Sequence, residues 1–318
     1  MTDISVVIPT SRSDYLDFTL QSLSKQRTTF DFEVVVVENP KHTDHVEFLC
    51  SKYGYTHIVC YDIGANNARN HGIKIAKASL IGLLDDDVIL CKDWIERAVS
   101  VSKIYPSFGI LGGRTPLEFG SGHPKWGEGF FRMMWSEVDW PEKGIVELEV
   151  RERHVVSANM VFRKEVWEKL GGLDCRVGYS GTDMVSNDEL EFQRTIATLY
   201  KPGLLYDSEM IARHIVRPEK LEIGWLKKRF YGQGKADALY YSKVYDGKPL
   251  NDIFHDVVQH QGIHFIPVEE TAEVREKIAN EDITREYIKR LTICKTAYMA
   301  GLVEGLMRES ILDFGEYN

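Results

Sequence analysis

The stretch that decides the fold is Leu83-Leu84-Asp85-Asp86-Asp87-Val88, in which three consecutive carboxylates end an apolar run. The apolar residues predict a buried strand. Three adjacent acidic side chains at a strand end repel one another unless a positive charge neutralises them, and a divalent cation bound by carboxylate oxygens can do so. In an extended chain Asp85 and Asp87 point to one side and Asp86 to the other. The sequence predicts a metal site here, with an acidic turn before a helix at Trp94–Val101 as the alternative.

Short β-branched runs alternate with helical spacings through the first third of the chain. Strands are expected at residues 4–8, 33–37, 57–60 and 80–84, and helices at residues 15–26, 45–53 and 65–77. Such alternation is typical of an α/β fold with a mainly parallel sheet covered by helices on both faces. Ligands of these folds bind at the carboxyl ends of the strands. Pro9-Thr10, Glu38-Asn39 and the three carboxylates all follow expected strands, which favours one ligand site there.

The remainder of the chain is less regular. Strands are expected at residues 107–113 and 155–162, and helices at residues 164–170, 189–199, 271–279 and 284–308. Residues 114–150 are rich in Gly, Trp and Phe and predict a long loop, which is usually functional or mobile. We therefore expect an α/β domain over residues 1–245 and a helical extension over residues 246–318.

Bulk composition limits the function classes. The chain has 318 residues and a net charge of −9, which argues against nucleic-acid binding because that requires a basic face. Its five cysteines form no CxxC pair, so reduced thiols are expected and not a disulfide framework. No apolar run reaches the roughly 20 residues that span a bilayer, and the N-terminus does not resemble a signal peptide. We expect a cytoplasmic protein, with peripheral contact to the inner face of the membrane left open.

Several common motifs of α/β proteins are absent from the sequence. It contains no GxGxxG, no GxxxxGK[ST] and no GxSxG pattern, which excludes dinucleotide-binding, P-loop and ordinary hydrolase signatures. What remains is the acidic triplet, a basic helix start at Ala68-Arg69-Asn70, an acidic pair at Asp188-Glu189 and an isolated His214. A metal, an arginine and a distant carboxylate suit chemistry on a phosphate ester.

These motifs, in this order, resemble glycosyltransferase family 2, whose members have the GT-A fold. The residues that carry the resemblance are Val6-Val7-Ile8-Pro9-Thr10, Val36-Val37-Glu38-Asn39, Ala68-Arg69-Asn70-His71-Gly72, Leu84-Asp85-Asp86-Asp87, Ser157-Ala158-Asn159-Met160, Gly171-Gly172-Leu173-Asp174, Asp188-Glu189-Leu190-Glu191 and His214 with the basic helix 225–234. The resemblance covers residues 3–240. It implies a Rossmann-like sheet and transfer of a sugar from a nucleotide donor.

The resemblance also implies roles for single residues. The donor would lie against Pro9, Thr10, Arg12, Glu38, Asn39, Arg69, Asp85 and Asp86. Mn²⁺ or Mg²⁺ would be held by Asp85, Asp87 and His214, although which of the three adjacent carboxylates bind the metal stays open. The family usually has Asp where this chain has Glu38, which could accept a hydrogen bond from a base N–H or a ribose hydroxyl. Arg69 would offer a bidentate fork to phosphate.

The catalytic base is expected in the acidic pair. An inverting transfer needs a base for the acceptor hydroxyl, and the family places it in a Glu-Asp pair that this chain reverses. One alignment gives Glu189 this role and a shift by one residue gives it to Asp188. The same pair could instead be an ordinary charge pair at a helix N-terminus.

The expected function is therefore inverting, metal-dependent glycosyl transfer from a nucleotide-diphosphate sugar, UDP-type first, to a hydroxyl of a glycan or lipid-linked acceptor. A nucleotidyltransferase is one alternative, although the segment after the first strand lacks the glycines typical of that class. A non-catalytic nucleotide- or sugar-binding scaffold is the other. The basic aromatic segment 225–231 could lie on a membrane surface, and the C-terminal helices could join two chains.

Overall fold

The computed structural model describes residues 2–40, 42–120, 122–150, 153–180, 183–185, 188–244 and 281–315. It divides into two compact units. The sheet unit comprises Met1–Glu118, Ser136–Gly181 and Asp188–Ile215, and the helical unit comprises Phe119–Trp135, Thr182–Asn187 and Val216–Asn318.

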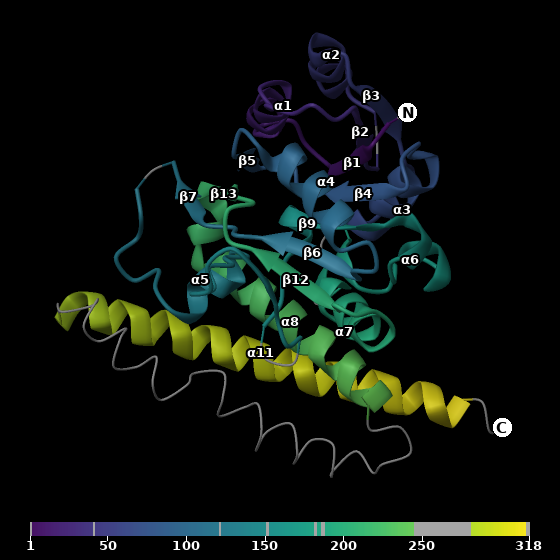
Figure 1. Cartoon of the computed structure of the whole chain (residues 1–318). Coiled ribbons are helices and arrows are strands. Elements are labelled where there is room, and N and C mark those ends of the chain that lie inside the picture. The colour runs from purple at the N-terminus through teal and green to yellow at the C-terminus, as the bar shows by residue number, and fades with distance from the viewer. Residues whose placement is uncertain are drawn as a thin grey trace. The chain divides into compact units, whose positions relative to one another are not determined.

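Eight strands of the described chain form one mixed sheet (Figure 1). In spatial order they are β3 (Thr56–Val59), β2 (Phe32–Glu38), β1 (Ile4–Thr10), β4 (Leu80–Leu83), β9 (Met160–Arg163), β6 (Ile110–Gly113), β12 (Leu204–Asp207) and β8 (Ile145–Glu147). β3, β2, β1 and β4 are mutually parallel, as are β6 and β12. β9 is antiparallel to both of its neighbours, and β8 is antiparallel to β12. The predicted α/β fold with a mainly parallel sheet is confirmed.

Amphipathic helices cover this sheet. They are α1 (Leu16–Ser24), α2 (Asp44–Tyr53), α3 (Ala65–Ile75), α4 (Trp94–Ile104), α6 (Lys164–Lys169) and α7 (Asp188–Leu199). In α1 the buried Leu16, Leu20 and Leu23 recur at helical spacing, so one face enters the core. In α3 a Cβ at Gly72 would overlap the side chains of Val7 and Val37, so the absence of a side chain lets α3 approach β1 and β2 closely.

The middle of the chain is more ordered than its composition predicts. The expected loop 114–150 contains β7 (Leu117–Phe119), α5 (Phe130–Met134) and β8. The expected strand 155–162 is a 3₁₀ turn at Ser157–Asn159 followed by β9. β7 joins β5 (Val88–Leu90) and β13 (Ala212–Val216) in a small sheet of order β5-β13-β7. These strands pair with segments far away in the sequence, so local periodicity does not reveal them. Short strands β10 (Gly178–Ser180) and β11 (Asp183–Val185) follow α6, and a 3₁₀ turn lies at Pro218–Leu221.

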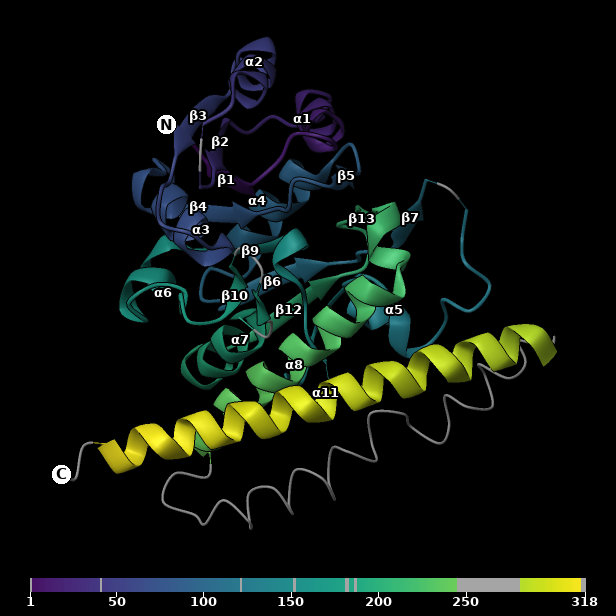
Figure 2. The same ribbon diagram turned by 180° about the vertical axis from the view of Figure 1, so that it is seen from behind.

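The helical unit is built on two long helices, α8 (Ile223–Val244) and α11 (Glu281–Gly315), which lie side by side in both views (Figures 1 and 2). A Cβ at Gly234 or Gly301 would overlap a backbone carbonyl of the opposite helix, so both glycines permit close contact. Between the helices, Tyr298 Oη donates a hydrogen bond to Asp237 Oδ2 at 2.9 Å. The predicted C-terminal helix 284–308 is confirmed, whereas the predicted helix 271–279 lies outside the described residues. Within the described chain, no helix is long and apolar enough to cross a membrane.

Candidate active site

Strand pairing brings His214 to the acidic triplet. β13 pairs antiparallel with β5, and the register sets His214 opposite Val88, the residue after Asp87. Ile215 N donates to the backbone oxygen of Asp87 at 2.8 Å, which fixes this register beyond the strand itself. As a result, His214 Nε2 lies 3.1 Å from Asp87 Oδ1, and both side chains are buried.

Asp85, Asp87 and His214 together form a potential metal site. Each offers one ligand atom, and these atoms lie within 4.8 Å of one another. Carboxylate oxygen and imidazole nitrogen suit a divalent ion such as Mn²⁺. The donor set therefore fits the metal that the sequence predicts, and the predicted orientation of Asp85 and Asp87 toward one side agrees with it.

The Arg69 guanidinium forms an ion pair with Asp85. Arg69 is 6% exposed on α3, and its Nη2 lies 3.0 Å from Asp85 Oδ1 and 2.9 Å from Ser157 Oγ. Its Nη1 donates to Asn66 Oδ1 at 3.0 Å. Arg69 thus joins the first carboxylate of the triplet to α3 and to the turn before β9.

The middle carboxylate contacts β1. Thr10 Oγ1 at the end of β1 lies 2.6 Å from Asp86 Oδ2, and both residues are buried. Pro9 is partly exposed beside Thr10, and Arg12 is exposed in the segment that follows. Thr10 and the triplet therefore meet at the carboxyl ends of adjacent strands, where α/β folds bind ligands.

Glu38 and Asn39 at the end of β2 are both engaged with the protein. The Glu38 carboxylate is 1% exposed and accepts hydrogen bonds from Thr43 N at 2.9 Å and Thr43 Oγ1 at 2.6 Å. His57 Nε2 lies 3.0 Å from the same carboxylate. Asn39 Nδ2 donates to the carbonyls of Cys60 and Asp62, while Gly64 N donates to Asn39 Oδ1 at 3.0 Å. Both side chains thus shape the loops that start α2 and α3.

The two candidate bases lie at the N-terminus of α7. Asp188 begins the helix, and Glu189 follows with a partly exposed side chain. Further along α7, the buried Gln193 clamps the backbone of Val155, accepting from its N–H at 2.9 Å and donating to its carbonyl at 2.8 Å. This clamp ties α7 to the segment that leads into the Ser157 turn.

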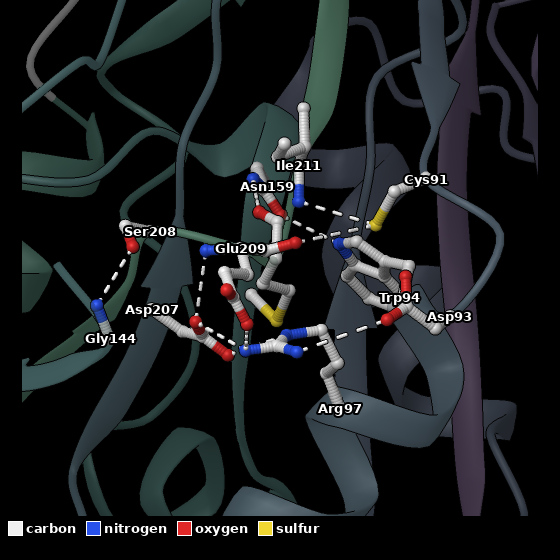
Figure 3. A network of polar contacts seen from close by, with 11 residues as sticks. Cys91, Asp93, Trp94, Arg97, Gly144, Asn159, Asp207, Ser208, Glu209 and Ile211 are labelled. Atoms are coloured by element: carbon white, nitrogen blue, oxygen red, sulfur yellow. Dashed lines mark hydrogen bonds and ion pairs between the residues drawn. The ribbon is translucent and has the colours of Figure 1, made fainter.

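A buried polar network supports the turn that leads into β13 (Figure 3). Arg97 on α4 forms a bidentate pair with Asp207 at the end of β12, with both N–O distances 2.9 Å. Asn159 accepts from Trp94 Nε1 at 2.7 Å and donates to the Met210 carbonyl at 2.9 Å. These contacts hold residues 207–211, so they fix where the strand carrying His214 begins.

Comparison with known proteins places the chain in a family. Residues 5–171 match glycosyl transferase family 2. The chain belongs to this family. The glucosyl-dolichyl phosphate glucuronosyltransferase of Haloferax volcanii is 24% identical to it over 254 residues, which cover 77% of this chain and 80% of that protein.

Two solved structures share the fold of this glycosyltransferase. The mannosyltransferase PcManGT from Pyrobaculum calidifontis, in complex with GDP-Man and Mn²⁺, has a TM-score of 0.58 and 17% identity, covering 95% of this chain and 86% of its own. S. aureus TarS 1–349 in complex with UDP-GlcNAc has a TM-score of 0.53 and 15% identity, covering 95% of this chain and 90% of its own. At such low identity the likeness concerns the fold alone, and it agrees with the predicted GT-A architecture.

Sequence reasoning missed several polar residues around the site of this glycosyltransferase. Asn66, His57 and Thr43 each hydrogen-bond a predicted site residue. One signal was available, because Asn66 stands three positions before Arg69 and residues at that spacing lie on the same helix face. Thr43 and His57 reach Glu38 only after α2 and β3 have folded beside β2.

Proposed function

We propose that this glycosyltransferase is inverting and metal-dependent. It moves a sugar from a nucleoside-diphosphate sugar to a hydroxyl of an acceptor, and the first candidate donor is a UDP-sugar. The observation that supports this most directly is the group formed by Asp85, Asp87 and His214, whose ligand atoms lie within 4.8 Å at the carboxyl edge of the sheet. Family membership favours glycosyl transfer over the nucleotidyltransferase and the scaffold.

In this proposal Asp85, Asp87 and His214 hold Mn²⁺ or Mg²⁺, which offsets the charge that builds on the leaving diphosphate. Arg69 keeps Asp85 in place through the 3.0 Å ion pair, and Thr10 orients Asp86 toward the donor. PcManGT, which shares this fold and was solved in complex with GDP-Man and Mn²⁺, supports a divalent ion here.

Glu189, with Asp188 as the alternative, takes the proton of the acceptor hydroxyl. The acceptor oxygen then forms a bond to the sugar carbon as the bond from that carbon to the diphosphate oxygen breaks, with the proton left on the carboxylate. Attack on the face opposite the leaving group inverts the configuration. The resemblance of Asp188-Glu189 to the acidic pair of the family supports this role.

The nucleoside would contact Pro9, Arg12, Glu38 and Asn39. The Glu38 carboxylate is 1% exposed, accepts hydrogen bonds from Thr43 and lies next to His57, so a contact with a base N–H or a ribose hydroxyl would require Thr43 or His57 to move. Asn39 contributes through the loop 60–64 that it fixes.

We further propose a lipid-linked or glycan acceptor, a cytoplasmic protein with peripheral membrane contact, and oligomer contacts through the C-terminal helices. The name of the Haloferax relative, a glucosyl-dolichyl phosphate glucuronosyltransferase, supports a lipid-linked sugar as acceptor. The division into a GT-A domain over residues 1–245 and a helical extension over residues 246–318 is part of the same proposal.

Thermal unfolding with a panel of nucleotide diphosphates and nucleotide sugars, each with Mn²⁺, Mg²⁺ or chelator, tests the donor site. A ligand at 100 times its dissociation constant adds about 2.7 kcal/mol of stability. We expect a shift with one nucleotide that is lost with chelator and in Asp87→Asn, but kept in the matched control Asp31→Asn, whose side chain is exposed. A folded protein that shifts with no nucleotide, or an Asp87→Asn variant that shifts like the wild type, would contradict the proposal.

A further inference from the structure

Two asparagines of α3 hold the loop 173–178, which follows α6. Asn66 Nδ2 donates to the carbonyls of Asp174 at 2.8 Å and Val177 at 3.2 Å. Asn70 Nδ2 donates to the Leu173 carbonyl and its Oδ1 accepts from Leu173 N, both at 2.9 Å. The loop is therefore attached to α3 near both of its ends.

One glycine stands just before the loop and another is its last residue, and both lie against the same two side chains. Gly172 has φ +100° and Gly178 has φ +102°, a region that L side chains rarely adopt. A Cβ on Gly172 would lie 3.2 Å from Asn70 Oδ1, and one on Gly178 would lie 3.3 Å from Asn66 Nδ2. The backbone thus has positive φ angles at the two positions where it contacts the Asn66 and Asn70 side chains.

Asn66 also contacts the metal-site arginine. Its Oδ1 accepts from Arg69 Nη1 at 3.0 Å, while Nη2 of the same planar guanidinium pairs with Asp85. Asn66 is 1% exposed, so water does not compete for these bonds. A continuous chain of hydrogen bonds runs from the partly exposed Asp85 through the buried Arg69 and Asn66 to the loop backbone.

We infer that Asn66 is a positioning residue that sets the loop 173–178 relative to Asp85. Along the chain this loop precedes α7, which carries the candidate base Glu189. Asn66 touches neither donor nor acceptor in this inference, and it acts through Arg69 on one side and the loop on the other. The part that concerns the rate of sugar transfer rests on the proposed function.

Asn66→Asp tests the contact of residue 66 with the loop while keeping its contact with Arg69. The substituted carboxylate keeps an oxygen toward Arg69 but faces the Asp174 and Val177 carbonyls with a second oxygen, which repels them. Asn67→Asp is the matched control, because it makes the same change one residue later on α3, where Asn67 Nδ2 donates to the Ile63 carbonyl just before the same helix and not to the loop. Asn66→Ala, which adds no charge, covers the case in which Asn66→Asp fails to fold.

Amide hydrogen exchange of the unliganded protein is the first measurement, since it needs neither donor nor activity. We expect peptides covering residues 172–178 to exchange about tenfold faster in Asn66→Asp than in Asn67→Asp, with peptides of β1 and β2 unchanged. Equal exchange of the loop in the two variants would overturn the inference, whatever the donor proves to be.

Kinetics then separate positioning from a general loss of stability. We expect kcat of transfer in Asn66→Asp to fall about 10–100-fold, because small displacements of reacting groups cost that much. The Mn²⁺ dissociation constant should stay near that of Asn67→Asp. A parallel loss of Mn²⁺ binding and kcat would contradict a role through the loop. If the wild type binds no nucleotide, the proposed function fails while the exchange result still stands.

Discussion

Replacing Arg97 by Met should strongly destabilise the sheet unit. Arg97 is the bidentate partner of Asp207, whose side chain is 0% exposed, whereas the side chain of Arg97 is 23% exposed. Burial opposes the charge on the guanidinium, but the Asp207 hydrogen bonds and charge outweigh it and raise the pKa of Arg97. Without Arg97, the buried Asp207 carboxylate keeps, among the residues that the structure describes, the hydrogen bond from Glu209 N at 3.0 Å.

The size of the effect follows from burial. Removing one partner of a buried ion pair costs about 3–5 kcal/mol. For chains of this size about 2–4 °C of Tm corresponds to each kcal/mol, which predicts a drop of about 6–20 °C. Glu209 and Asp93 also contact Arg97, but their side chains are 67% and 52% exposed and should contribute little.

Arg114→Met is the matched control for Arg97→Met. Arg114 forms a bidentate pair with Asp139 at 2.7 Å for both bonds, but the side chains are 37% and 39% exposed. Loss of that pair should cost only about 0–1 kcal/mol. The assay is calorimetric Tm, with urea unfolding as a check. The double variant Arg97→Met/Asp207→Asn should recover most of the loss, since the buried charge is gone. If Arg97→Met costs no more than Arg114→Met, burial of Asp207 does not govern stability and the reasoning is refuted.

Two further predictions concern catalysis and pH. Glu189→Gln should lower kcat about 10²–10⁴-fold, as for loss of a general base. The control Glu191→Gln, on the same helix, should leave kcat unchanged. If Asp188→Asn lowers kcat and Glu189→Gln does not, the base is Asp188. Burial, then the charge of Arg194, lowers the pKa of His154 to about 4, so the unfolded chain takes up this proton first as pH falls. The contribution of neutral His154 to the free energy of unfolding is therefore fully present above pH 6.5 and should fall by about 2 kcal/mol between pH 7.5 and 5. Urea titrations at these two pH values should detect this loss in the wild type and not in His154→Gln.

Local patterns in the sequence were enough to predict the sheet and the acidic cluster. Alternating Val/Ile runs and helical spacings predict β1 to β4 and α1 to α3, since burial on both faces leaves a clear apolar pattern. The Asp85-Asp86-Asp87 triplet stands out because adjacent like charges are costly at the end of a buried strand. Each of these features depends on neighbours close along the chain.

Contacts between distant segments could not be predicted in this way. His214 contacts Asp87 because β13 pairs with β5, and the sequence of residues 212–216 does not identify β5 as the partner strand. Asn66 contacts carbonyls more than 100 positions away, so its helix position gives only the direction in which it points. The prediction of a long loop over residues 114–150 was wrong for the same reason, because β8 becomes a strand by pairing with β12.

The sequence predicts a metal as the partner of the acidic triplet, but the three carboxylates also have partners within the protein. Asp85 pairs with Arg69 at 3.0 Å, Asp86 accepts from Thr10 at 2.6 Å, and Asp87 lies 3.1 Å from His214. Each carboxylate thus has a polar partner on a different element, α3, β1 and β13, and the Arg69 guanidinium supplies a positive charge beside Asp85. A site that is organised by its own side chains differs from structural metal sites, in which binding of the ion supplies the folding free energy. In the proposed function, these contacts would position the carboxylates before the metal and the donor bind.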